Sequence, residues 1–326
     1  MNQINMPMIP RRKFLQLTGA TLAGLSLSGS YGSPIPGKKR TLGVQLFTIP
    51  QMAEKDLKGT LGLLGEIGYR EVEFFGPYDF SAPETIESWK PIAAQLGIKS
   101  NAFYGYTIAE VKKMLKDYGL KVPSVHLDLI TLRHHLEPAM EAFALLDVKY
   151  VAIPSLRNQE ERNSLDGFRR LAEEFNQIGK KMARYGLTFT YHNHGYEHWE
   201  KEGQTPMEIL LRNTDPSWVA FEMDIFWMTA GGADPVQFLK SYPGRFKLMH
   251  IKDAAEKVRF SGDGSTPDQW MALFPKMADP GTGVFDIKSI LAAADQSGTT
   301  HFYLERDLTA DPVKTLKNSY AYLEKI

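Results

Sequence analysis

Eight short apolar runs, each followed by a segment with helical spacing, constrain the fold of this chain more than any other feature. The runs cover residues 42–47, 71–75, 122–127, 150–153, 187–192, 218–224, 246–250 and 301–305. Regular alternation of strands and helices predicts parallel βαβ units. We therefore expect a single-domain α/β protein with a (β/α)8 TIM-barrel fold over residues 39–326.

The segments between the runs support this alternation. Helices are expected over residues 57–67, 83–90, 108–118, 138–146, 165–185, 206–212, 235–241, 287–296 and 311–325. Asp311 is the expected N-cap of the last helix, with Pro312 at its first position. His134 and His135 are expected in a solvated loop. A doubly wound open sheet is the main rival, but no glycine fingerprint follows the first apolar run.

The first 38 residues have the pattern of an export signal that precedes the barrel. Arg11-Arg12-Lys13-Phe14-Leu15 is a twin-arginine pattern, and a moderately apolar stretch and a Gly/Ser/Pro-rich linker follow it. The pattern predicts a twin-arginine signal peptide and linker over residues 1–38, and a periplasmic or otherwise exported protein. The alternative is a disordered basic amino-terminus. The apolar stretch is too short and too polar for stable membrane insertion.

The composition excludes several classes of function. Lys plus Arg and Asp plus Glu both number 38, and this zero net charge gives no support for nucleic acid as a partner. The chain has no cysteine, which excludes disulfides, thiolate metal ligands and a cysteine nucleophile. A hydrophobic content of 43% is enough for a buried core. The sequence is also compatible with a homo-oligomer.

Four polar residues stand at the carboxyl ends of the last four apolar runs: His192, Asp224, His250 and Glu305. The carboxyl ends of the strands form the active-site face of a (β/α)8 barrel. Two imidazoles and two carboxylates at that face predict a site for one divalent metal ion, such as Mn²⁺, Zn²⁺, Co²⁺ or Mg²⁺.

Side-chain alternation along the strands supports this prediction, because residues two apart share a face of a strand. The polar residues that share a face in this way are His192 with His194, Glu222 with Asp224, His250 with Lys252, Glu305 with Asp307, Ser124 with His126, and Glu71 with Glu73. Buried charges must be paired or bound to metal, so packing alone does not explain this pattern. Several alternatives stay open: Asp224 could cap the following turn, His194 could replace His192, and Lys252 could pair with Asp253 or Glu222. Glu305 could pair with Arg306 or Lys252, and His250 and His126 could be structural histidines of the barrel.

Motifs in a fixed order resemble those of the sugar phosphate isomerase/epimerase family, which has the xylose isomerase-like TIM barrel. They are Gly43-Val-Gln-Leu-Phe47, Leu64 to Glu73, Tyr191-His-Asn-His194, Met223-Asp224, His250-Ile-Lys-Asp253, Gly281 to Asp286 and Glu305-Arg-Asp307. The resemblance implies one divalent metal on Glu, Asp, His and Glu of the last four strands. Asp224, His250 and Glu305 match the last three positions, whereas His192 replaces the first glutamate.

The resemblance also implies a reaction that begins with proton abstraction α to a carbonyl. We expect Glu305, His126 and Lys252 to be catalytic, and His194, Trp227, Asp307 and Glu73 to contact the substrate. A solvent-facing aromatic at His198 and Trp199 could in addition stack on a sugar.

A small-molecule carbohydrate is the expected partner, and a non-phosphorylated one, because export tells against a cytoplasmic sugar phosphate. Because His192 replaces the family's first glutamate, two kinds of reaction are expected. One is isomerisation or epimerisation, and the alternative is a lyase or hydratase reaction on a 3-keto-glycoside. A non-catalytic exported sugar-binding protein is the alternative from another class. A metal-dependent endonuclease would need a basic surface, which the zero net charge does not provide.

Overall fold

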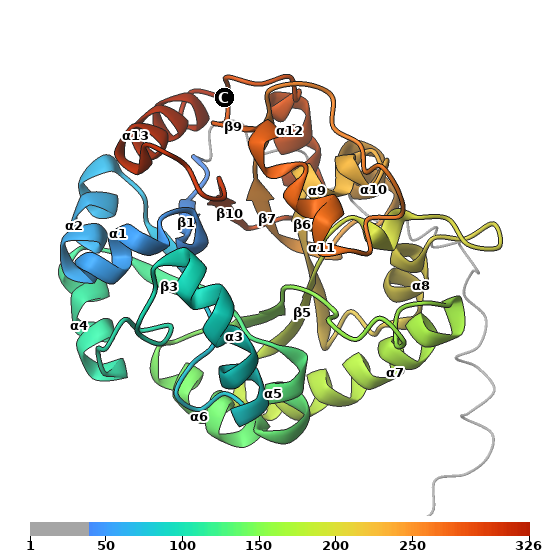
Figure 1. Ribbon diagram of the computed structural model, residues 1–326, viewed down its shortest axis with the longest axis horizontal. Coiled ribbons are helices and arrows are strands. Elements are labelled where there is room, and N and C mark those ends of the chain that lie inside the picture. Colours follow the sequence, from blue (N-terminus) through green and yellow to red (C-terminus); the bar gives the residue numbers. More distant parts are fainter. Residues whose placement is uncertain (1–38) are drawn as a thin grey trace, which may run out of the picture. The chain divides into compact units, whose positions relative to one another are not determined.

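The eight predicted strands close into one parallel barrel in the computed structural model of the chain, which describes residues 39–326 (Figure 1). The barrel strands are β1 (Leu42–Gln45), β2 (Glu71–Phe75), β3 (Lys121–His126), β4 (Tyr150–Ile153), β5 (Thr188–His192), β6 (Val219–Asp224), β7 (Phe246–Ile251) and β10 (His301–Leu304). Their order around the barrel is β1-β10-β7-β6-β5-β4-β3-β2. The predicted barrel is confirmed, whereas the predicted export signal lies outside the described residues.

Helices surround the barrel, as the view in Figure 1 shows. They are α1 (Pro50–Lys55), α2 (Leu57–Ile67), α3 (Pro83–Leu96), α4 (Ile108–Asp117), α5 (Leu129–His134), α6 (Leu136–Leu145), α7 (Leu165–Met182), α8 (Pro206–Asn213), α9 (Ile225–Ala230), α10 (Pro235–Ser241), α11 (Pro267–Met271), α12 (Ile287–Ser297) and α13 (Pro312–Leu323). Short 3₁₀ turns are η2 (Leu46–Thr48), η3 (Ala183–Tyr185), η4 (Tyr196–His198) and η5 (Phe274–Lys276). Within residues 39–326, no helix has the length and apolar character needed to cross a membrane.

Side-chain caps fix where several of these helices begin. Thr107 and Glu110 form a reciprocal capping box at the start of α4. Asp311 accepts a hydrogen bond of 3.1 Å from the backbone N–H of Lys314 at the start of α13, with Pro312 at the first helical position. The predicted start of the last helix is therefore confirmed.

The structure differs from the predicted elements in several places, of which the following bear on the site or its surroundings. Helix α3 continues to Leu96 although Pro91 was expected to end it; the carbonyl that Pro91 leaves without a partner belongs to the exposed residue Glu87. His134 ends helix α5 and is not in a loop, because Asp128 caps this short helix. Strands β8 (Asp253–Ala254) and β9 (Met277–Ala278) form an additional antiparallel pair outside the barrel.

The interior of the barrel is filled below the strand ends. Tyr150, Ala220, Leu248 and Tyr303 form a separate buried cluster, and alternation along the strands puts them on the same faces as the polar residues nearer the carboxyl ends. Side chains of opposite parity pack in the main core between the strands and the helices. The polar strand ends therefore lie above a packed layer and not at the mouth of a pore.

Candidate active site

A cavity of about 660 Å³ lies over the carboxyl ends of the barrel strands. The polar side chains of its floor are His126, His192, His194, Lys252, Glu305 and Asp307. Its walls include the aromatic side chains of Phe47, Phe75, Trp89, Trp227, Trp270 and Phe274. A concave, mostly apolar cavity with a few convergent polar groups is the usual form of a small-molecule site.

The four predicted metal ligands come together at this floor. Asp224, His250 and Glu305 each offer one ligand atom, and these atoms lie within 4.8 Å of one another. The Nε2 atom of His192 is 3.7 Å from Oδ2 of Asp224. All four side chains are buried. We call these residues the upper group; two imidazoles and two carboxylates form a donor set that fits a divalent ion.

Asp224 combines two roles that the sequence left as alternatives. Its Oδ1 atom caps helix α9 by accepting a 2.9 Å hydrogen bond from the backbone N–H of Trp227. Its Oδ2 atom is buried and accepts no hydrogen bond, although the Nζ atom of Lys252 lies 3.2 Å away. This oxygen already lies beside one cation and accepts no hydrogen bond, so it can also serve as a ligand to a metal ion in the upper group.

Lys252 is a fixed cation among three carboxylates. Its Nζ atom is 2.8 Å from Asp307, 2.9 Å from Glu305 and 3.2 Å from Asp224. Burial alone would lower the pKa of Lys252, but the three carboxylates outweigh burial and raise the pKa above its usual value. Lys252 is therefore protonated at neutral pH, which suits charge stabilisation and does not suit proton abstraction.

Glu305 and Asp307 differ in charge although both line the cavity. Burial tends to raise the pKa of Glu305, but Lys252 and His250 outweigh this effect and hold the pKa well below its usual value. For Asp307, burial prevails over Lys252 and raises the pKa to about 7. Near neutral pH, Glu305 is thus ionised, and Asp307 can both hold and release a proton.

Two buried glutamates lie deeper than the upper group and contact its histidines. Glu222 and Glu73 are fully buried and do not line the cavity. The sequence did not identify Glu222 as a site residue, although its shared face with Asp224 was visible. Glu73 was expected to contact the substrate, but it accepts a 2.8 Å hydrogen bond from Gln45 and lies 2.6 Å from Nε2 of His250. We correct its expected role, because Glu73 does not line the cavity and contacts His250 from the side away from Glu305.

The charge of the three histidines that contact these glutamates follows from burial and from their neighbours. Burial would lower the pKa of His126, but Glu73 and Glu222 outweigh it and raise the pKa to about 9. Burial would likewise lower the pKa of His250, but Glu222, Glu305 and Glu73 raise it well above the usual value. Burial prevails at His192 and lowers its pKa, despite its hydrogen bond to Glu222.

His194 lies on the side of the cavity formed by the segment after β5. Its ring stacks on Trp227 with centroids 6.0 Å apart, and Trp270 lies on it at 5.5 Å. Burial holds the pKa of His194 well below its usual value, and its Nδ1 atom has no hydrogen-bond partner. His194 is therefore a neutral imidazole with a free ring nitrogen beside the cavity. Trp227 also lines the cavity, as expected for a substrate contact.

The His198–Trp199 pair does not form the sugar-stacking surface that the sequence suggested. His198 is buried, with its ring edge-on to Phe238 at 5.0 Å, and Trp199 is exposed without lining the cavity. Both ring nitrogens of His198 lack hydrogen-bond partners. Burial lowers the pKa of His198 to about 3, so its ring is neutral in the folded protein.

We expect His198 to make the protein sensitive to mild acid. The ring takes up a proton near pH 6.5 in the unfolded chain but only near pH 3 in the folded protein. The stability of the folded state therefore does not depend on His198 protonation above pH 6.5, and it falls as the pH is lowered from 6.5 toward 3. At pH 5 the loss in free energy of unfolding is about 2 kcal/mol. His198→Leu should abolish this loss. Urea unfolding at pH 7 and at pH 5, with a chelator present in both, measures the difference in free energy of unfolding. The exposed His134, changed to Leu, serves as the control. An unaltered pH dependence in His198→Leu would contradict this account.

Comparisons with known proteins agree with the observed architecture. Residues 62–326 match the family described as xylose isomerase-like TIM barrel. An inosose dehydratase from Lacticaseibacillus casei is 28% identical over 166 residues, which are 49% of this chain and 53% of that protein. The chain thus spans about half the length of this curated relative.

Two solved structures are also similar. A sugar phosphate isomerase/epimerase from Parabacteroides distasonis ATCC 8503 has a TM-score of 0.67 and 25% identity, covering 90% of this chain and 96% of that one. The IolI protein, solved with a bound zinc atom, has a TM-score of 0.54 and 17% identity. The similar region covers 87% of this chain and 95% of the IolI chain, and it shows that the two proteins share a fold.

Proposed function

Because the chain belongs to the xylose isomerase-like TIM-barrel family, we propose that it is a divalent-metal-dependent sugar isomerase or epimerase. The reaction would begin with abstraction of a proton α to a carbonyl. One observation carries this proposal: the ionised Glu305 lines the cavity, 2.6 Å from His250 and 2.9 Å from Lys252. A carboxylate, a fixed cation and a set of metal ligands thus meet at one point of the floor.

His192, Asp224, His250 and Glu305 would hold the ion. When bound, a divalent cation polarises a carbonyl and stabilises negative charge on its oxygen. The zinc bound to the IolI protein supports a metal in this fold without identifying the ion here.

The remaining steps are assigned to side chains around the floor. Glu305 takes the α proton, and the ammonium of Lys252 stabilises the oxygen that gains negative charge. Asp307, with a pKa of about 7, is the group that can return a proton, and the free ring nitrogen of the neutral His194 can accept one. His194 follows β5, whereas Asp307 follows β10, so protons can be exchanged from two sides of a bound sugar.

A non-phosphorylated sugar is the proposed substrate. Lys252, Arg133 and Arg157 are the Lys and Arg side chains that line the cavity among the described residues. Lys252 is bound by carboxylates, Arg133 pairs with Glu161 and Glu174, and Arg157 lies over the ring of Trp89. None of these cations is grouped with another as a phosphate site requires. The aromatic walls suit the apolar faces of a sugar ring.

A dehydratase or other lyase is the second candidate, because His192 replaces the carboxylate that a two-carboxylate epimerase would use. The similarity to inosose dehydratases supports this alternative. Elimination begins with the same α proton and then expels a neighbouring oxygen group, for which Asp307 is an acid of suitable pKa.

The test is a screen of keto-sugars and glycosides in D₂O with metal-loaded and chelated protein. Deuterium at the α carbon without a change in composition supports an isomerase or epimerase. A product that lacks one molecule of water or of an alcohol, relative to the substrate, supports the lyase. Binding without any exchange, unaffected by chelation, would contradict both and leave a sugar-binding protein.

We also propose export through the twin-arginine pathway, on the basis of Arg11 and Arg12 and the apolar stretch after them. Changing both arginines to lysine should leave the full-length precursor in the cytoplasm, because this pathway reads the arginine pair. Cell fractionation with immunoblotting measures the distribution. Changing Lys38 of the linker to arginine is the control. Unchanged export of the Arg11→Lys, Arg12→Lys variant would refute the signal.

A further inference from the structure

Both ring nitrogens of each histidine in the upper group face carboxylates, and Nε2 of His250 lies 3.2 Å from Glu222 as well as beside Glu73. In His250, Nδ1 is 2.6 Å from Glu305, and Nε2 is 2.6 Å from Glu73. In His192, Nε2 faces Asp224 at 3.7 Å, and Nδ1 is 3.0 Å from Glu222. In both rings, therefore, one nitrogen faces a carboxylate of the upper group and the other faces a deeper glutamate.

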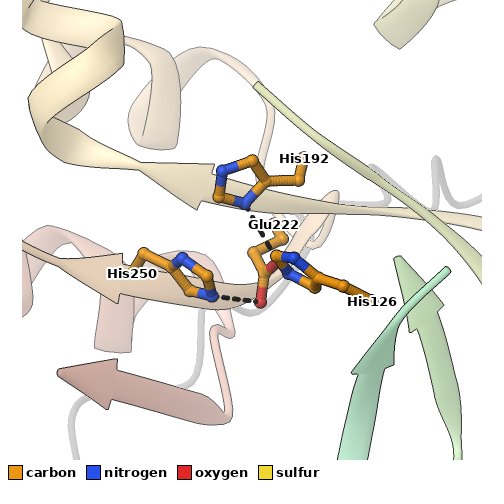
Figure 2. A group of neighbouring side chains, drawn as sticks. All are labelled: His126, His192, Glu222 and His250. Atoms are coloured by element: carbon orange, nitrogen blue, oxygen red, sulfur yellow. Dashed lines mark hydrogen bonds and ion pairs between the residues drawn. The ribbon is translucent and has the colours of Figure 1, made fainter. Parts of the chain in front are cut away.

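The deeper glutamates are joined to each other through a third histidine. The Nε2 atom of His126 is 2.8 Å from Glu222 and 3.3 Å from Glu73. Figure 2 shows His126, His192 and His250 arranged around the carboxylate of Glu222. These contacts tie β2, β3, β5, β6 and β7 together beneath the floor.

We propose that Glu222 and Glu73 are positioning residues for the metal. Each accepts a ring N–H, Glu222 from Nδ1 of His192 and Glu73 from Nε2 of His250. The tautomer is then fixed so that the opposite nitrogen of each ring offers its lone pair to the upper group. His126 holds the two carboxylates in place. This inference rests on the proposed function, because it concerns the same ion.

A rival arrangement places the ion lower, on His126, His192, Glu222 and His250, whose ligand atoms also lie within 4.8 Å of one another. That arrangement would use the opposite ring nitrogens of His192 and His250. Each arrangement contains two residues that line the cavity: His126 and His192 in the lower one, and His192 and Glu305 in the upper one. The upper group offers two carboxylates to the ion, and one of them, Glu305, lines the cavity where a substrate would bind. The lower arrangement offers only Glu222, which does not line it.

The test measures metal affinity and coordination in the full chain. Glu222→Gln and Glu73→Gln keep the size of the side chain and remove its charge. We expect the Kd for Mn²⁺, from competition with a chelator, to rise about 10- to 100-fold in each variant. The visible spectrum of the Co²⁺-loaded protein should change as well. Glu71→Gln is the matched control: Glu71 shares β2 with Glu73 but pairs with His301 at 3.0 Å, and its Kd should not change.

Melting temperatures of the metal-free variants establish that each is folded. Unchanged Kd and Co²⁺ spectra in both glutamine variants would overturn the inference while leaving the proposed function intact. The inference is also wrong if His126→Gln abolishes binding and Asp224→Asn does not, since the ion would then lie in the lower arrangement. Failure of the wild-type chain to bind Mn²⁺ or Co²⁺ would remove the inference and the proposed function together.

Discussion

Glu305→Gln is expected to lower turnover by at least about a hundredfold, the usual contribution of general base catalysis. Glutamine retains an oxygen that can face a metal ion but cannot accept the α proton. The side chain lines the cavity beside Lys252 and His250, where it is ionised and can accept the proton. Deuterium incorporation from D₂O at the α carbon measures the effect directly.

The control for this substitution lies in the same cavity. Glu84 also lines the cavity, but it is exposed on helix α3, so Glu84→Gln should leave exchange unchanged. Metal content must be measured in parallel, because Glu305 is also a proposed ligand. If Glu305→Gln keeps its full metal content and exchanges deuterium at the wild-type rate, another residue is the base, and Asp307 becomes the first candidate.

Asp224→Asn is expected to weaken metal binding by about 100-fold or more, since loss of a ligand exceeds the effect of an outer residue. The asparagine oxygen can still cap helix α9 at the N–H of Trp227. Its amide nitrogen then takes the place of the free Oδ2 atom and offers no lone pair. Activity should disappear at metal concentrations that saturate the wild-type chain and return in part with excess ion.

Elemental analysis after dialysis, followed by metal titration, measures this loss. Asp234→Asn is the matched control, because Asp234 caps helix α10 in the same manner but is exposed and remote from the cavity. A normal metal content in Asp224→Asn would show that the ion does not use this carboxylate, and the predicted ligand set would be wrong.

The barrel could be predicted from the sequence because short, mostly apolar runs alternate regularly with segments of helical spacing. Alternation along the strands also placed His192, Asp224, His250 and Glu305 on faces that converge. The short helices α1, α5 and α9 and the β8–β9 pair were missed. Elements of two to six residues give too little periodicity and depend on contacts with the rest of the fold.

Depth was the quantity that the sequence could not provide. Residues two apart on a strand share a face, but only the assembled barrel shows which of them reaches the cavity. Glu222 was therefore overlooked beside Asp224, and Glu73 was expected at the substrate although it lies beneath His250. The charge states of Asp307 and His194 were equally out of reach, because they depend on burial and on partners from distant segments.

The contacts of His250 imply that metal binding at the proposed site is coupled to the release of a proton. Without a metal, both ring nitrogens lie 2.6 Å from carboxylates, and the ring carries a positive charge between Glu305 and Glu73. A metal ion could use Nδ1 only after the proton there has left. Each ion bound at the proposed site would therefore displace a proton, and its apparent affinity would rise with pH.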